Sequence, residues 1–246
     1  MFEPNENAFI KVYKHIQGRT AIIVDDFYKD PDEVRELALS LKYGVAPGLV
    51  SGFPGTRCSL ETFELKEKLY DLYLELCRSC GPLREDDFEK NWDVQGFMVN
   101  STNDSLIKKS PLSEIPHQDY WEGDSQDVST YQFGSVIFLN TPDECAGGTN
   151  LYSWKGEISI SLDRKTEWEQ NMSETMDITG PVLTSMSDDY KFKLTKDKVN
   201  RYYNCELKAG MKYNRMVLYQ SDVLHKADID LGMFTDYNRI NQVFFL

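Results

Sequence analysis

Residues 133–140 read Phe133-Gly134-Ser135-Val136-Ile137-Phe138-Leu139-Asn140, and this stretch decides the fold class. Its apolar side chains follow one another without the alternation of a half-exposed strand, as expected for a central strand covered on both faces. Further β-rich runs, separated by glycine, proline, aspartate and asparagine, occur at 95–100, 149–154, 202–207, 215–219 and 240–246. These runs predict a mainly β protein whose strands close into a double-stranded β-helix, the jelly-roll or cupin-like barrel.

The beginning of the chain carries helical patterns instead. Asp30 followed by Pro31, with Glu33 in the first turn, is a helix start, and apolar residues recur after it at helical spacing. A second apolar stripe of helical period runs over residues 65–80. We expect both helices to form a layer that supports the sheet, and the turn-rich residues 43–55 between them to border the mouth of the barrel.

A chain of 246 residues with 41% hydrophobic side chains can bury one good core. The sequence therefore predicts a single domain, with an N-terminal helical support region at 1–91 and the jelly-roll core at 92–246. A polar insertion at about 156–200 interrupts this core, and its composition fits a substrate-covering lid and a solvated excursion equally well. Within it we expect a helix at 164–176 and an edge strand at 190–194, where apolar and basic residues alternate.

The formal net charge is -13, from 40 acidic and 27 basic residues that are spread along the chain. Nucleic-acid binders normally present a basic stripe, so this balance argues against DNA or RNA as a partner.

The first residues lack the segments of a signal peptide, and no apolar run is long enough to cross a bilayer. The sequence thus predicts a cytoplasmic protein without a membrane partner, and it leaves the oligomeric state open. Five cysteines fit reduced thiols, and Cys77 with Cys80 lacks a second ligand pair for zinc.

Three histidines occur in the chain, and two of them stand where a mononuclear iron site needs them. His117 opens His117-Gln118-Asp119, and side chains two positions apart on a strand point the same way, so both groups can reach one metal ion. His225 follows a strand-like run and supplies the third ligand. Two imidazoles and one carboxylate leave one face of an octahedron open, which suits ferrous iron that must also hold a cosubstrate and dioxygen. His15 has no partner at a useful spacing and is expected to be an ordinary hydrogen-bonded residue.

Arg239 begins the last apolar run and is the natural anchor for an anionic group. Its guanidinium keeps its charge at any working pH and can donate two parallel hydrogen bonds to one carboxylate. Strand alternation places Arg239, Asn241, Val243 and Phe245 on one face, which could line the barrel interior. Taken alone, Arg239 is as compatible with a structural ion pair, and its position in this run favours the ligand role.

Six motifs stand in a fixed order along the second part of the chain: Pro116-His117-Gln118-Asp119, Val136-Ile137-Phe138-Leu139-Asn140, Gly147-Gly148-Thr149-Asn150-Leu151-Tyr152, Asn214-Arg215-Met216-Val217-Leu218-Tyr219, His225 and Arg239. This set resembles the iron(II)/2-oxoglutarate-dependent dioxygenases, in particular the prolyl-4-hydroxylase-like branch and its members with a Pro-His-x-Asp opening. The resemblance covers about residues 92–246 and extends more weakly to the start.

The resemblance implies a set of site residues and an activity. His117, Asp119 and His225 would be the iron ligands and catalytic residues, and Arg239 would anchor the C5 carboxylate of 2-oxoglutarate. The implied enzyme uses Fe(II), 2-oxoglutarate and O2 to hydroxylate a C–H bond of a prolyl peptide, an amino acid or another small substrate, with succinate and CO2 as coproducts. Because Asp119 is present where related halogenases have a small residue, hydroxylation is favoured over halogenation.

One position departs from the family pattern. Many relatives have a tyrosine two residues before the asparagine of the third core strand, where its hydroxyl helps to bind the cosubstrate carboxylate, and here the residue is Phe138. Asn241 and Tyr219 are the candidates for this second cosubstrate contact. Tyr219 could equally be an ordinary half-buried strand aromatic.

Two other classes of protein fit the same patterns. A cupin-like iron oxygenase that does not use 2-oxoglutarate could share the barrel and the metal ligands, although it would not need Arg239. A non-catalytic jelly-roll binding module is the third possibility, since a fold does not determine a function. The sequence does not identify the substrate within the class of small molecules and peptides.

Overall fold

The computed structural model describes residues 2–16, 19–44, 55–60, 95–101, 114–118, 133–155, 188–220, 223–230 and 232–245. The strands in these ranges are β1 (Phe9–Ile16), β2 (Arg19–Asp25), β3 (Thr56–Leu60), β4 (Gln95–Ser101), β5 (Phe133–Phe138), β6 (Gly148–Trp154), β7 (Tyr203–Gly210), β8 (Met216–Gln220), β9 (Leu224–Asp228) and β10 (Arg239–Phe245). The helices are α1 (Pro31–Ser40) and α5 (Asp188–Tyr202), with a short 3-10 helix at Pro142–Glu144.

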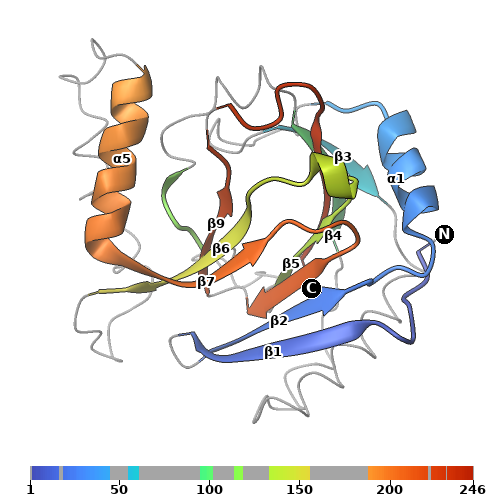
Figure 1. Cartoon of the computed structure of the whole chain (residues 1–246), viewed down its shortest axis with the longest axis horizontal. Coiled ribbons are helices and arrows are strands. Elements are labelled where there is room, and N and C mark those ends of the chain that lie inside the picture. Colours follow the sequence, from blue (N-terminus) through green and yellow to red (C-terminus); the bar gives the residue numbers. More distant parts are fainter. Residues whose placement is uncertain are drawn as a thin grey trace, which may run out of the picture.

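The described residues are mainly β, which confirms the predicted fold class at that level. The strands form a seven-stranded sheet of order β1-β2-β8-β5-β10-β4-β3 and a three-stranded sheet of order β7-β6-β9. All neighbouring strands run antiparallel. Helices α1 and α5 lie at opposite ends of the molecule, with the two sheets between them (Figure 1).

The larger sheet has a buried outer face that packs against α1. Val34 and Ala38 of α1 belong to one core cluster with Ile22 and Val24 of β2, Met98 of β4, Phe133 and Ile137 of β5, Met216 and Leu218 of β8, and Ile240 and Phe244 of β10. Every residue of β5 is buried, which confirms the prediction that residues 133–140 contain a central strand covered on both faces.

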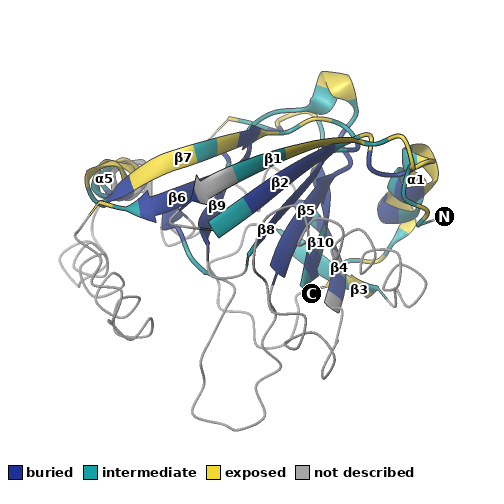
Figure 2. Cartoon of the chain, turned by 90° about the horizontal axis from the view of Figure 1, so that it is seen from below, coloured by how far each residue is buried: buried dark blue, intermediate teal, exposed yellow. Residues whose placement is uncertain are grey.

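The inner face of the larger sheet packs against the smaller sheet. Side chains of both sheets share a second core cluster, which includes Leu151 of β6, Ala209 of β7, and Ile23, Val136, Phe138, Val217 and Tyr219 of the larger sheet. Helix α5 covers the other side of the smaller sheet, where its Val199 packs with Tyr152, Tyr203 and Leu224. Figure 2 shows the resulting burial, with the central strands buried and much of β7 exposed.

Two glycines allow β6 to enter the smaller sheet. Gly147 and Gly148 have φ angles of 65° and 151°, which residues with a side chain rarely adopt. A Cβ atom on Gly147 would lie 1.9 Å from the carbonyl oxygen of Asp228, and one on Gly148 would lie 2.2 Å from that of Ala209. The glycine pair therefore lets the start of β6 pass close to the backbones of both neighbouring strands.

The N-terminal region differs from the predicted helical layer. Strands β1 and β2 form a hairpin that extends the larger sheet, and β3 adds a strand at its opposite edge. The β-branched and aromatic residues of β1 and β2 suit a pleated surface, which explains why these segments form strands. The first predicted helix is confirmed as α1, which Asp30 caps by accepting a hydrogen bond from the backbone N–H of Glu33. The second, at 65–80, lies outside the described residues.

The predicted insertion at 156–200 is described only from residue 188 onward, where the chain forms α5. The prediction of an edge strand at 190–194 is wrong, because these residues belong to this helix. An alternation over five residues is too short to decide the period. Thr195 and Val199 are both buried and lie one helical turn apart, so packing on the smaller sheet favours the helix. The predicted helix at 164–176 and most of the proposed lid lie outside the described residues.

Among the described residues, none of the helices combines the length and the apolar character that a bilayer crossing requires.

Candidate metal and anion site

His117 and His225 lie side by side, although they are far apart in the sequence. The backbone N–H of each donates a hydrogen bond to the carbonyl oxygen of the other, and both bonds measure 2.9 Å. Residues paired in this antiparallel manner present their side chains on the same face. The two imidazole rings accordingly have centroids 4.4 Å apart, with 52° between their planes.

Strand β9 positions the His225 ring and selects its tautomer. Leu151 is the partner of His225 on β6 and belongs to the core between the sheets, so His225 faces the inner side of the smaller sheet. Its Nδ1 lies 3.0 Å from the carbonyl oxygen of Val223, which requires a proton on Nδ1. The lone pair of the ring is then on Nε2, which is the arrangement that metal-binding histidines commonly have.

The histidine pair fits a divalent transition metal. Nitrogens that occupy neighbouring coordination positions at about 2.1 Å from a metal are about 3 Å apart, a separation that two rings at this distance can reach. Asp119, the third predicted ligand, lies outside the described residues. Within the described ranges, no three His, Cys, Asp or Glu side chains gather into a metal-binding group. The described part of the site therefore contains two of the three predicted ligands.

Arg239 is a buried cation at the start of β10. Only 4% of the residue is exposed, and its Nη1 donates a 2.5 Å hydrogen bond to Oδ1 of Asn241. Its Nε has no hydrogen-bond partner, and no carboxylate among the described residues pairs with it. Burial lowers the pKa of Arg239 to about 10. A buried charge is normally paired, so this guanidinium is suited to receive an anion.

Asn140 holds the backbone on both sides of Arg239. Its Oδ1 accepts a hydrogen bond from the backbone N–H of Ile240, and its Nδ2 donates one to the carbonyl oxygen of Asn238, each 2.8 Å long. Asn140 ends the stretch that decides the fold, and its side chain is fully buried. The central strand thus fixes the residue that begins β10.

The structure distinguishes between the two candidates for the second cosubstrate contact. Asn241 is paired with Phe138 across β10 and β5, so its side chain lies on the inner face together with that of Arg239. Because its Oδ1 accepts from Arg239, its Nδ2 is oriented as a second donor beside the guanidinium. Tyr219 lies on β8, and its ring centroid is 4.4 Å from that of His225. Asn241 is therefore associated with the arginine, and Tyr219 with the histidine pair.

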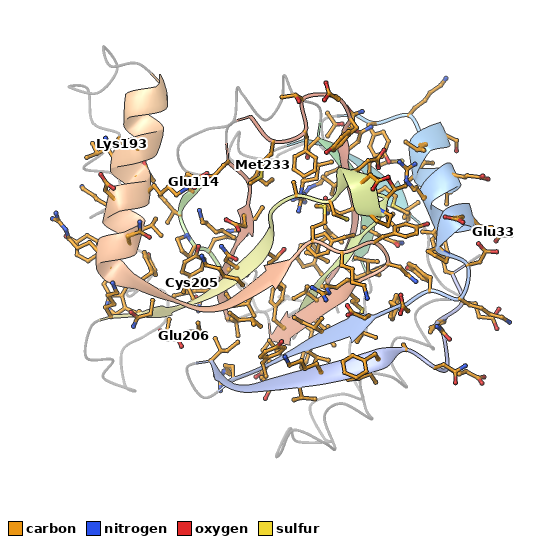
Figure 3. The ribbon with its side chains drawn as sticks, viewed as in Figure 1. Glu33, Glu114, Lys193, Cys205, Glu206 and Met233 are labelled. Atoms are coloured by element: carbon orange, nitrogen blue, oxygen red, sulfur yellow. The ribbon has the colours of Figure 1, made fainter. Side chains whose placement is uncertain are left out.

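Two site features were not predicted from the sequence. Strand β9 was not predicted, because its polar residues His225, Lys226 and Asp228 interrupt the apolar pattern expected of a buried strand. The second feature is a buried ion pair between Lys226 and Glu114, with 2.6 Å between Nζ and Oε2. Glu114 is labelled in Figure 3 on the short segment that leads to His117. The sequence offered no signal for this pair, because neither strand β9 nor the pairing of His117 with His225 was predicted.

The comparisons with known proteins identify a family and leave its activity open. No curated protein matches the chain. The model of a family of unknown function, DUF6445, matches residues 6–238 and so includes both histidines and Asp119, although its matched range ends just before Arg239. The chain belongs to this DUF6445 family.

Proposed function

We propose that the protein is an iron(II)- and 2-oxoglutarate-dependent dioxygenase that hydroxylates a C–H bond of a small molecule or peptide. The observation that carries this proposal is the combination of two features on the inner faces of the packed sheets. One is the histidine pair, in which the contact of His225 Nδ1 with the carbonyl oxygen of Val223 places the lone pair of the ring on Nε2, and the other is Arg239, a buried cation without a carboxylate partner among the described residues.

The arrangement of the strands supports a double-stranded β-helix as the finer description of the fold. From β4 onward, the chain alternates between the two sheets. Strand β4 belongs to the larger sheet, the 114–118 segment pairs with the smaller sheet, and β5 belongs to the larger sheet again. Strands β6 and β7 then belong to the smaller sheet. Strand β8 returns to the larger sheet, β9 to the smaller and β10 to the larger. Such crossings, which make strands distant in the sequence neighbours, are those of a Greek-key jelly roll.

The residues present define the roles that the proposal assigns. Iron(II), when bound, supplies the activation of dioxygen coupled to oxidative decarboxylation of 2-oxoglutarate to succinate and CO2. His117, His225 and, from the sequence, Asp119 would hold the metal. Arg239 and Asn241 would donate hydrogen bonds to the distal carboxylate of the cosubstrate.

The electrostatics of Arg239 favour a cosubstrate that carries an additional carboxylate. Removing the guanidinium from water without a counter-ion costs free energy, and an incoming carboxylate offsets this cost through charge-assisted hydrogen bonds. A cupin-like oxygenase that binds only dioxygen and a neutral substrate has no use for such a group. The buried arginine therefore favours the 2-oxoglutarate-dependent class over that alternative.

Succinate formation tests the proposal directly. The purified protein would be incubated with Fe(II), ascorbate and 2-oxoglutarate in air, first alone and then with a library of peptides, amino acids and other metabolites. We expect slow uncoupled succinate release that a substrate accelerates, and none from the matched variant His225→Ala. Iron binding without any response to 2-oxoglutarate would indicate a cupin-like oxygenase. A wild-type protein that binds neither iron nor 2-oxoglutarate would be a non-catalytic module.

A further inference from the structure

The ion pair between Glu114 and Lys226 lies on the opposite side of β9 from the histidine rings. Lys226 follows His225 in the strand, so the two side chains point to opposite faces of the smaller sheet. Lys226 is paired with Asn150, whose side chain faces the hydroxyl of Tyr152 in the layer beneath α5. The side chains of Lys226 and Glu114 are only 6% and 5% exposed.

Within the described residues 114–118, the segment that carries His117 is joined to β9 by one isolated bridge. Between the described residues 114–118 and β9, the backbone hydrogen bonds are the two that join His117 and His225, which form an isolated bridge. A shift of this segment by one residue would turn the His117 side chain to the other face of the sheet. A single bridge specifies the register of a short segment only weakly, so side-chain contacts close to it contribute to that register.

We propose that Glu114 and Lys226 are positioning residues that hold the His117 segment in the register in which both imidazoles reach one metal ion. Glu114 precedes His117 and Lys226 follows His225, so the pair joins the two histidine-bearing segments a second time, behind the rings. A shifted segment would break the 2.6 Å contact between two buried charges, which strongly disfavours that arrangement. This inference rests on the metal site of the proposed function and adds the device that assembles it.

A contribution to stability alone does not account for this pair. Two charges lose their hydration when they are buried, so a buried ion pair is often no more stabilising than apolar side chains of similar volume. What an ion pair adds is directionality, because only one placement of Glu114 satisfies Lys226. The two interpretations make different predictions for a variant in which both partners are apolar.

The test uses Co(II) as a spectroscopic probe of the metal site under anaerobic conditions, with circular dichroism to monitor folding. The single variants Lys226→Met and Glu114→Gln should fold and bind Co(II) about 10- to 100-fold more weakly, the loss typical when a group that orients a metal ligand is removed. The exchanged variant Glu114→Lys/Lys226→Glu should recover most of the affinity. The apolar variant Glu114→Leu/Lys226→Met should recover stability but not affinity. Arg35→Met, which breaks the pair of Arg35 with Glu144 on the α1 side, is the matched control and should bind Co(II) normally.

Hydrogen exchange of the metal-free protein provides a second readout that does not depend on the proposed function. The backbone amides of His117 and His225 should exchange faster in both single variants and return toward wild-type rates in the exchanged variant. Unchanged Co(II) affinity in the single variants, or full recovery of affinity in the apolar variant, would overturn the inference. A wild-type protein that binds Co(II) no better than His225→Ala would instead refute the metal site, and the exchange rates alone would then decide whether the pair sets the register.

Discussion

Replacing Arg239 with methionine distinguishes between two roles of this residue, a structural ion pair and the binding of an anionic ligand. Methionine has a similar length, remains apolar and adds no new charge to the interior. A structural arginine in an ion pair would lose its pairing energy in this variant, and the protein would become less stable. An arginine that is buried without a counter-ion costs the protein stability until a ligand arrives, so its removal should not destabilise the ligand-free fold.

The magnitude follows from the lowered pKa of Arg239. Burial lowers this pKa to about 10, which corresponds to a penalty on the charged form on the order of 3 kcal/mol, at roughly 1.4 kcal/mol per tenfold change in the ionisation constant. The variant also loses the hydrogen bond to Asn241, which contributes about 1 kcal/mol. We therefore expect Arg239→Met without ligand to be as stable as the wild type, or more stable by up to about 2 kcal/mol.

The assay is unfolding of both proteins with and without 2-oxoglutarate. A ligand at about 100 times its Kd stabilises a protein by about 2.7 kcal/mol, which raises the melting temperature of a domain of this size by roughly 5–10 °C. The loss of a bidentate charged contact should weaken 2-oxoglutarate binding by on the order of a hundredfold. At the same ligand concentration the rise in melting temperature of Arg239→Met should then be about 1 °C.

The control is Arg215→Met, which removes an arginine that pairs with Asp25 at 2.5 Å. This variant should be slightly less stable than the wild type and keep the full response to 2-oxoglutarate. The reasoning about Arg239 is refuted if Arg239→Met loses several kcal/mol of stability without ligand, or if its response to 2-oxoglutarate equals that of the wild type.

Three further predictions concern the metal, pH and the backbone. His225→Ala should abolish iron-dependent succinate formation while the far-ultraviolet circular dichroism stays that of the wild type, and normal turnover would remove His225 from the site. The hydrogen bond from Arg215 holds the pKa of Asp25 below its ordinary 3.8, so the stability that this carboxylate adds, about 1 kcal/mol, is present above 3.8 and lost as the pH falls below it. The difference in unfolding free energy between the wild type and Asp25→Asn should vanish in that acidic range, and a constant difference would contradict the assignment. Gly147→Ala should cost about 3 kcal/mol or more in urea unfolding, whereas Gly232→Ala, which has a positive φ but open space around its Cβ, should cost only about 1–2 kcal/mol.

The sequence predicted the strands whose signal is local and missed those that depend on context. Strand β5 was recognised because a strand covered on both faces is continuously apolar, and β10 because a short apolar run follows Arg239. The β1–β2 hairpin was missed although Ala21, Ile22, Ile23 and Val24 form a continuous buried run. This run is shorter than that of β5, and the prediction for the N-terminal region followed the capping pattern at Asp30 and the helical spacing after it.

The candidate site was predictable in its residue types and not in its supporting contacts. The spacing of His117 and Asp119 and the position of Arg239 are local patterns with chemical meaning. The bridge between His117 and His225, by contrast, joins positions that are far apart in the sequence. The contacts that depend on it, between Glu114 and Lys226 and between Tyr219 and His225, can be recognised only when the strands are paired.

The two halves of the site are joined by the core and not by a loop. His225 is paired with Leu151 across the smaller sheet, and Asn241 with Phe138 across the larger one. Leu151 and Phe138 are fully buried and belong to the same core cluster between the sheets. The separation of the histidine pair from the arginine is therefore set by close-packed side chains, which resist compression and expansion. Under the proposed function, a fixed separation of this kind would suit a dicarboxylate of defined length, with one end at a metal ion held by the histidine pair and the other at the guanidinium.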